Sequence, residues 1–197
     1  MIIVGVTGNI ATGKSTVAQF FKELGAYVVD WDELAREVVR PHSKAWKEIS
    51  KHFGNGVSVS ILSINRQKLA DIVFSGERAL AKLNQIVHPQ VIEMDRRTTN
   101  AIKNRDPDAL IIKLIPLLFE VTRPIFVDKV IVVSASEETQ VRRLEEKGVD
   151  RRDARRRIES QLPIEEKVKS ADFVIDNDGT LGETSRQVED LYTLLRK

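Results

Sequence analysis

Five short apolar runs recur along the chain, with helix-length segments between them. They are IIVGVT (2–7), AYVVD (26–30), ALIIKLI (109–115), KVIVVS (129–134) and DFVID (172–176). Apolar residues occupy both alternating positions in these runs, which is typical of parallel strands buried on both faces of a sheet. The pattern therefore predicts an α/β fold with a doubly wound, mainly parallel five-stranded sheet between helices.

The segment after the first run has the pattern of an amphipathic helix. Val17, Phe20, Phe21 and Leu24 recur at helical spacing, and Gly25 follows as a stop signal. We therefore expect a helix over residues 14–24.

Two longer segments do not fit a simple alternation of strands and helices. Residues 32–104 are too many for one crossover helix and contain helical patterns separated by GNGVS, Ser75-Gly76 and His88-Pro89. We interpret them as an inserted helical subdomain. Residues 136–169 carry the densest charge in the chain and predict a helical lid. Residues 1–31, 105–135 and 170–197 would form the core of a single domain spanning 1–197.

Composition narrows the function classes. The 197 residues are 42% hydrophobic and 30% charged, as in an ordinary globular protein. A formal charge of +2 is too small to indicate a dedicated nucleic-acid or membrane surface, so neither partner is expected, and the oligomeric state stays open. The chain has no cysteine, which excludes thiolate chemistry and fits a reducing cytoplasm. No apolar stretch approaches the roughly 18 residues of a membrane span.

The stretch GNIATGKST (8–16) carries the strongest chemical signal. Its spacing, Gly8-x-x-x-x-Gly13-Lys14-Ser15, follows a predicted strand and opens a predicted helix, which is the context of a phosphate-binding P-loop. Glycines let backbone N–H groups surround phosphates, and the helix N-terminus adds positive charge. Lys14 would reach the β- and γ-phosphates, and the Ser15 hydroxyl would ligate Mg²⁺. The alternative is a glycine-containing turn with a surface lysine, which the context disfavours.

The carboxylates after the second run suggest which reaction follows. No guanine-reading Asn-Lys-x-Asp element is present, and the third run has no acidic residue next to it, unlike many ATPases. Asp30 and Asp32 instead end the second run, on the same edge of a parallel sheet as the P-loop. One of them could accept the proton of an attacking hydroxyl and help to hold Mg²⁺. The alternative is that Asp32 caps a helix over 33–40, and the residues leave both interpretations open.

These residues, taken in order, resemble the dephospho-coenzyme A kinase family. The likeness includes VTGNIATGKSTV, VVDWDELAREVV, NRQKLADIVF (65–74), IPLLFE (115–120), RIESQ (157–161) and ADFVIDNDG (171–179). The resemblance implies transfer of the γ-phosphate of MgATP to the ribose 3′-hydroxyl of dephospho-coenzyme A. It also implies that the inserted helices bind this substrate and that the charged lid closes on ATP.

The resemblance implies a set of site residues. Asp32 and Lys14 would be catalytic, and Ser15 and Asp32 would hold the metal. ATP would be bound by Gly8, Ala11, Thr12, Gly13, Lys14, Ser15, Thr16, Arg143, Arg157 and Asn177. The acceptor would be bound by Asp32, Arg66, His88, Pro116, Leu117 and Glu120.

Several of these residues also have plain structural interpretations. His88 before Pro89 is better read as a helix junction than as a substrate contact, because the residue before proline is pushed out of helical geometry. Arg66 could pair near a helix start, and the turn sequence at Asn177 needs no ligand. The lid arginines other than Arg143 and Arg157 alternate with acidic residues, which is typical of a solvated, ion-paired surface.

The chain departs from the family pattern at the loop itself. Ala11 and Asn9 stand where glycine is usual, and alanine tolerates a positive φ poorly, so Ala11 predicts either an allowed geometry or some strain. Lys147 replaces a common arginine, and Leu114 replaces a common acid. The alternative functions are another small-molecule P-loop kinase, such as a nucleoside monophosphate kinase, or a regulatory protein that binds ATP without transferring phosphate.

Overall fold

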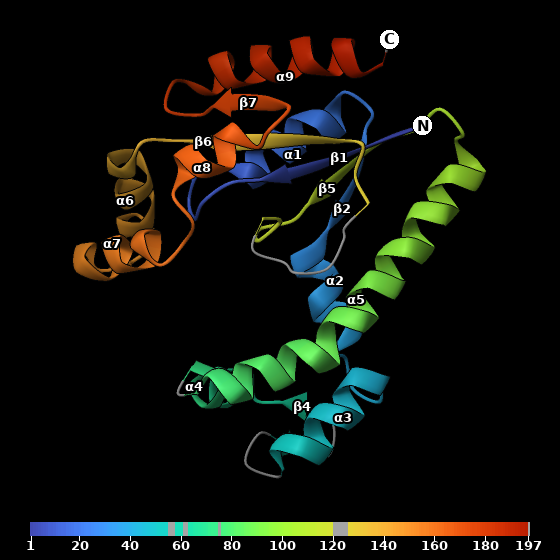
Figure 1. The fold of residues 1–197 in the computed structure, drawn as a ribbon, viewed down its shortest axis with the longest axis vertical. Helices are drawn as coiled ribbons and strands as arrows, with labels where there is room; N and C mark the ends of the chain where they lie inside the picture. Colours follow the sequence, from blue (N-terminus) through green and yellow to red (C-terminus); the bar gives the residue numbers. More distant parts are fainter. Residues whose placement is uncertain (55–57, 61–62, 75, 120–125, 197) are drawn as a thin grey trace. The chain divides into compact units, whose positions relative to one another are not determined.

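The computed structural model describes residues 1–54, 58–60, 63–74, 76–119 and 126–196. The chain divides into two compact units (Figure 1). We call Met1–Asp30 together with Ile102–Lys197 the core unit, and Trp31–Ala101 the inserted unit.

The core unit is built on a parallel sheet. Its strands are β1 (Ile2–Thr7), β2 (Tyr27–Asp30), β5 (Leu110–Leu114), β6 (Lys129–Ser134) and β7 (Phe173–Asp176). They lie in the order β2-β5-β1-β6-β7, and every neighbouring pair is parallel. The predicted five-stranded α/β fold is confirmed, with each strand within one residue of its apolar run at either end.

Both faces of this sheet are buried, which explains the unbroken apolar runs. Helices α1 (Lys14–Glu23) and α9 (Leu181–Leu195) contribute Phe21 and Val188 to a core that contains Val4 and Val6 of β1. Ile111, Lys113 and Val132 alternate along their strands with residues of this core, so their side chains face the other side of the sheet, and they are buried as well. A strand with two buried faces needs apolar side chains at nearly every position.

Helix α1 confirms the helix predicted over 14–24, one residue short of its expected end. Gly13 precedes it with a φ of 94°, and Gly25 follows it with a φ of 100°. The Ala26 N–H then donates to the Phe21 carbonyl at 3.0 Å. This hydrogen bond satisfies one of the carbonyls that a helix end leaves open.

The charged segment after β6 folds into α6 (Glu137–Glu145), α7 (Arg151–Glu159) and α8 (Ile164–Lys169). Ser136 and Asp150 cap α6 and α7 by accepting hydrogen bonds from backbone N–H groups. Val141, Leu144 and Ala154 form a buried cluster on these two helices, and Ile10 and Ala11 of the loop pack against it. The predicted lid region is therefore helical and has an apolar underside that contacts the P-loop.

The inserted unit is mainly helical. Its elements are α2 (Trp31–Val38), α3 (Lys44–Phe53), β3 (Ser58–Ser60), β4 (Ser63–Ile64), α4 (Arg66–Phe74) and α5 (Glu77–Arg105), the last of which continues into the core unit. Ala45, Ile49 and Ile86 form its buried core. The antiparallel pair β3–β4 was not predicted, because the alternation of valine and serine at 57–60 is short and lies within a segment dominated by helical patterns.

The predicted helix break at His88-Pro89 is wrong. Pro89 lies inside α5, a helix of 29 residues. A proline removes one backbone hydrogen bond and crowds the preceding turn, which bends a helix without always ending it. Ile86 and Val91 are buried on either side of it, so packing favours continuation. Figure 1 shows that α5 bends part-way along its length.

The interpretation of Asp32 as a helix cap is also wrong. Helix α2 begins at Trp31, so Asp32 is its second residue and lies in the first turn rather than at the cap. An acidic side chain in the first turn still interacts favourably with the helix dipole. The Trp31 indole N–H donates to Asp95 Oδ1 at 3.2 Å and ties the start of α2 to α5.

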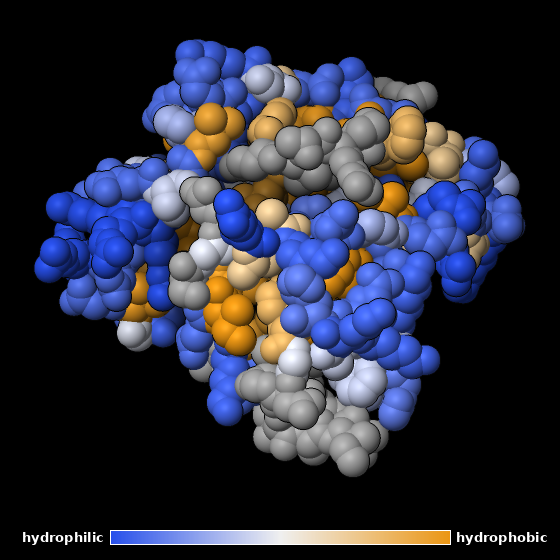
Figure 2. Space-filling view, turned by 60° about the horizontal axis from the view of Figure 1, so that its bottom comes forward, coloured by the Kyte–Doolittle hydropathy of each residue, from blue (hydrophilic) through white to orange (hydrophobic). Residues whose placement is uncertain are grey.

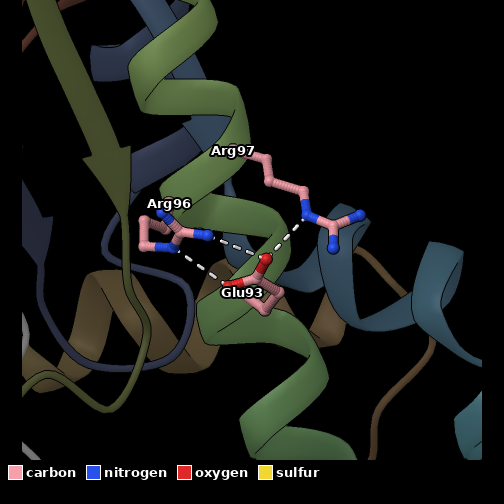
Figure 3. A network of polar contacts seen from close by, with 3 residues as sticks. All are labelled: Glu93, Arg96 and Arg97. Carbon is pink, nitrogen blue, oxygen red and sulfur yellow. Dashed lines mark hydrogen bonds and ion pairs between the residues drawn. The ribbon is translucent and has the colours of Figure 1, made fainter.

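A compact charge network lies on the solvent side of α5 (Figure 3). The Glu93 carboxylate accepts hydrogen bonds from Arg96 Nε at 3.0 Å and Arg97 Nε at 2.7 Å. These two arginines lower the pKa of the Glu93 carboxyl from its ordinary value of 4.5 to about 2.

Among the described helices, none is long and apolar enough to cross a membrane.

Candidate active site

The P-loop, residues 8–16, runs from the end of β1 to the first turn of α1. Gly8 has a φ of 148° and Gly13 a φ of 94°. A Cβ atom at Gly8 would collide with the Val133 carbonyl, and one at Gly13 would collide with the Asn177 side-chain amide. Both glycines of the motif are therefore required by backbone geometry and by close neighbours.

The loop presents hydrogen-bond donors at the start of α1. Within the described part of the chain, the N–H groups of Ala11, Gly13 and Ser15 donate no hydrogen bond. Lys14 Nζ donates to the carbonyls of Gly8 at 2.9 Å and Asn9 at 2.8 Å, which places the ammonium group over the loop. Open N–H groups, a helix N-terminus and an ammonium group together can bind an anionic phosphate chain.

Ala11 adopts the left-handed conformation that its position in the motif led us to consider. Its φ is 60°. This region is less favourable by about 1–2 kcal/mol for an L-residue with a Cβ atom, whereas glycine adopts it freely. The loop is therefore strained at Ala11.

Arg143 of α6 lies against the loop. Its Nη1 donates to the carbonyls of Ala11 and Thr12, each at 3.2 Å, and its Nη2 donates to the Asn177 carbonyl at 2.7 Å. The sequence predicted a contact between this arginine and the nucleotide. In the structure its guanidinium fork fixes backbone carbonyls on the loop, a role that the motif alone did not indicate.

Asn177, directly after β7, is almost fully buried. Its Nδ2 donates to the Thr12 carbonyl at 2.7 Å, and its Oδ1 accepts from Thr184 Oγ1 at 2.7 Å. Both ends of the amide are thus used inside the protein. The contact that we predicted between Asn177 and a nucleotide remains a prediction, while its packing against the loop is observed.

Gln161 is a loop contact that the sequence did not predict. The Ile10 N–H donates to Gln161 Oε1 at 2.7 Å, and Asn9 Nδ2 donates to the Leu162 carbonyl at 3.3 Å. The available signals were its place in the RIESQ segment and its lack of charge, just after a helix dominated by arginine and acidic residues. A glutamine carboxamide can satisfy a backbone N–H at a distance that Asn or Ser cannot reach.

Asp178 joins the end of β7 to the start of α6. Its carboxylate accepts hydrogen bonds from the Ser136 N–H and hydroxyl, all at 2.9 Å. Partial burial acts to raise the pKa of Asp178, but these hydrogen bonds outweigh it and hold the pKa below its ordinary value. The carboxylate therefore stays ionised and fixes the position of the α6 cap.

The strand ends on this side of the sheet carry other predicted residues. Thr7 Oγ1, at the end of β1, donates to the Pro116 carbonyl at 3.3 Å, so Pro116 lies beside the start of the loop. Leu117 follows it and is half exposed. Asp30 ends β2 at the same edge of the sheet. Glu120 lies outside the described residues.

Comparison with known proteins assigns this arrangement to a family. The family model described as dephospho-CoA kinase matches residues 2–183. The chain belongs to the dephospho-CoA kinase family. It is 45% identical to the dephospho-CoA kinase of Leifsonia xyli over the full length of both chains.

Solved structures agree with this assignment. The chain is similar to TT1252 from Thermus thermophilus, with 34% identity, 98% of this chain and 97% of that chain covered, and a TM-score of 0.83. It is also similar to a dephospho-CoA kinase from Campylobacter jejuni, with 25% identity, 98% and 96% covered, and a TM-score of 0.66.

The remaining residues predicted from the dephospho-CoA kinase resemblance lie in two places. Asp32, Arg66 and His88 belong to the inserted unit. Asp32 is exposed, His88 is half-buried within α5, and Arg66 begins α4 with a side chain outside the described part. Arg157 lies on α7 in the core unit and is exposed.

The other arginines of α6 and α7 behave as predicted for a solvated surface. Exposed ion pairs join Arg142 to Glu146, Arg151 to Glu145, Arg155 to Glu137 and Arg156 to Asp153. Figure 2 shows strongly hydrophilic surface over these helices, on the left of the view. Such exposed pairs contribute little to stability.

The donors available for a metal are oxygen atoms. Among the described residues, no group of three or more acidic or histidine side chains is arranged to hold a metal ion. Mg²⁺ commonly binds one or two protein oxygens together with phosphates and water, so it does not need such a cluster. The Ser15 hydroxyl, exposed in the first turn of α1, is a donor of this type.

Proposed function

We propose that the protein transfers the γ-phosphate of MgATP to the ribose 3′-hydroxyl of dephospho-coenzyme A, giving coenzyme A and ADP. The observation that carries this proposal is the P-loop geometry in a chain of the dephospho-CoA kinase family. Two glycines of the loop have positive φ, several of its N–H groups have no acceptor among the described residues, and Lys14 Nζ lies against its carbonyls.

The phosphate chain of ATP would lie on the loop. The N–H groups around Ala11, Gly13 and Ser15 would donate to phosphate oxygens, and Lys14 would exchange its loop carbonyls for the β- and γ-phosphates. Mg²⁺, held by Ser15 and Asp32, would neutralise charge on the phosphates when bound. The roles of Gly8 and Thr12 would be to shape this loop.

Asp32 would act on the acceptor. As the acceptor oxygen forms its bond to phosphorus and the bond to ADP breaks, the hydroxyl proton would pass to the Asp32 carboxylate. Arg66, His88, Pro116, Leu117 and Glu120 would hold the acceptor. Arg143 and Arg157 would contribute positive charge near the transferred group. Arg143 would do so from its position on the backbone of the loop, where it binds the Ala11 carbonyl.

The test is phosphoryl transfer with a panel of acceptors. The purified protein, ATP and Mg²⁺ would be incubated with dephospho-coenzyme A, AMP, CMP or UMP, and the products separated by mass. We expect coenzyme A and ADP in equal amounts, with little turnover of the nucleotides. Phosphorylation of a nucleoside monophosphate instead would favour the alternative kinase. ATP binding without transfer to any acceptor would favour the regulatory protein.

A further inference from the structure

Two parts of the lid segment hold the P-loop. From the segment after α7, Gln161 Oε1 accepts the Ile10 N–H at 2.7 Å. From α6, Arg143 Nη1 donates to the carbonyls of Ala11 and Thr12 at 3.2 Å. These contacts fix the Asn9–Ile10 peptide, one residue before Ala11, and the Ala11–Thr12 peptide directly after it.

Ala11 is the residue in this loop that most needs such support. Its φ of 60° is the positive φ of a residue with a Cβ atom, whereas Gly8 and Gly13 have no Cβ atom to disfavour it. A backbone in this region persists only when its surroundings determine it. Once the Asn9–Ile10 peptide is released, Ile10 is free to rotate and Ala11 can return to the negative φ that alanine favours, so the donor geometry of the loop is lost.

We propose that Gln161 is a positioning residue for the phosphate loop, which it serves by holding the Ile10 N–H so that Ala11 stays left-handed. The proposal rests on the proposed function, because the ligand of the ordered loop is the phosphate chain of ATP. In this role the Gln161 side chain binds the Ile10 N–H and not the phosphate chain. Its effect on ATP passes through the backbone of residues 10–12.

The proposal makes a specific statement about coupling between positions 161 and 11. With alanine at position 11, loss of the Gln161 acceptor lets the loop leave the left-handed form, which alanine disfavours by about tenfold or more. With glycine at position 11, left-handed and right-handed forms are about equally accessible, so the same loss has a far smaller effect. The effect of removing Gln161 should therefore depend on the residue at position 11.

The experiment is a double-mutant cycle of wild type, Gln161→Met, Ala11→Gly and the double variant. Methionine keeps the length of glutamine and removes the hydrogen-bond acceptor. Titration of each protein with Mg²⁺ and a non-hydrolysable ATP analogue gives Kd, and thermal unfolding monitors the fold. Gln19→Met is the matched control, because the Gln19 amide donates to the Glu23 carboxylate on the exposed surface of α1. If Gln161→Met did not unfold cooperatively, Gln161→Asn would carry the same test.

We expect Gln161→Met to raise Kd about tenfold in the Ala11 background and about twofold or less in the Ala11→Gly background. An increase in Kd that is no larger with alanine than with glycine at this position would overturn the proposal. A purely structural role would lower the unfolding temperature and leave this difference in Kd at zero. Failure of the proposed function is seen separately, since wild type itself would then not bind the analogue or not form coenzyme A.

Discussion

Two arginine sites, one in each unit, differ in what the guanidinium groups bind. In the core unit, Arg143 donates to the backbone carbonyls of Ala11, Thr12 and Asn177, and it is half-buried. In the inserted unit, Arg96 and Arg97 donate to the Glu93 carboxylate at the surface (Figure 3). The first arrangement fixes the shape of a loop, and the second joins three charged groups that water already solvates.

This difference separates what a charge pattern can reveal from what it cannot. An acid three or four residues from an arginine on a helix predicts a surface ion pair directly. An arginine that serves backbone carbonyls has no such partner in the sequence. Its role depends on which loop the fold brings to it.

The largest expected effect concerns Asp32, an exposed acid of the inserted unit to which we assign a role in catalysis. Asp32→Asn should lower turnover by about a hundredfold to ten-thousandfold while ATP affinity stays close to wild type, because the amide cannot accept the acceptor's proton. Steady-state kinetics and an ATP titration would measure both quantities.

The matched control for that variant is Glu33→Gln, which changes the neighbouring exposed acid in the same turn. It should retain near-normal turnover. Normal turnover by Asp32→Asn would place Asp32 among the ordinary surface carboxylates, and Asp30 at the end of β2 would become the candidate base.

An intermediate effect is expected at Asn177, which contacts the loop at Thr12, whereas Gln161 contacts it at Ile10. Asn177→Ala removes hydrogen bonds to the Thr12 carbonyl and the Thr184 hydroxyl inside a buried site. Stability should fall by about 1–3 kcal/mol, measured by urea unfolding. Asn104→Ala, at an exposed position near the end of α5, is the control and should stay near wild type. A similar small loss in both variants would refute a structural role for Asn177.

The smallest effect is expected at Glu93. Its folded pKa of about 2 lies below the ordinary 4.5, so ionised Glu93 stabilises the fold above pH 4.5, and this contribution is lost as pH falls towards 2. The side chain is 40% exposed, so screening keeps the contribution small. The difference in unfolding temperature between wild type and Glu93→Gln should shrink between pH 5 and about pH 2. A difference that does not change across this range would show that the network contributes nothing.

The sheet was predictable because strands buried on both faces leave a continuous apolar pattern, as IIVGVT and KVIVVS do. Helix α1 was predictable because its apolar spacing ends at a glycine that supplies positive φ. At position 11 the sequence showed a residue with a Cβ atom where glycine is usual, and it left open whether the backbone there would be strained.

Other features depend on three-dimensional context that the sequence does not show. Pro89 predicts a helix end locally, but burial of Ile86 and Val91 carries α5 through it. Gln161 acts on Ile10 across 151 residues, a separation that no local pattern reports. The local sequence around Asn177 is typical of a turn. Its burial against the loop follows from the position of β7 beside β6, which the local sequence does not show.

The positions of Trp31 and Trp46 have a practical consequence. The chain contains two tryptophans, and both belong to the inserted unit. Intrinsic tryptophan emission is therefore an optical reporter of that unit, while circular dichroism averages the helices of both. Recording the two signals together while one sample is heated would reveal whether the core unit and the inserted unit unfold in one cooperative transition, without attaching a dye.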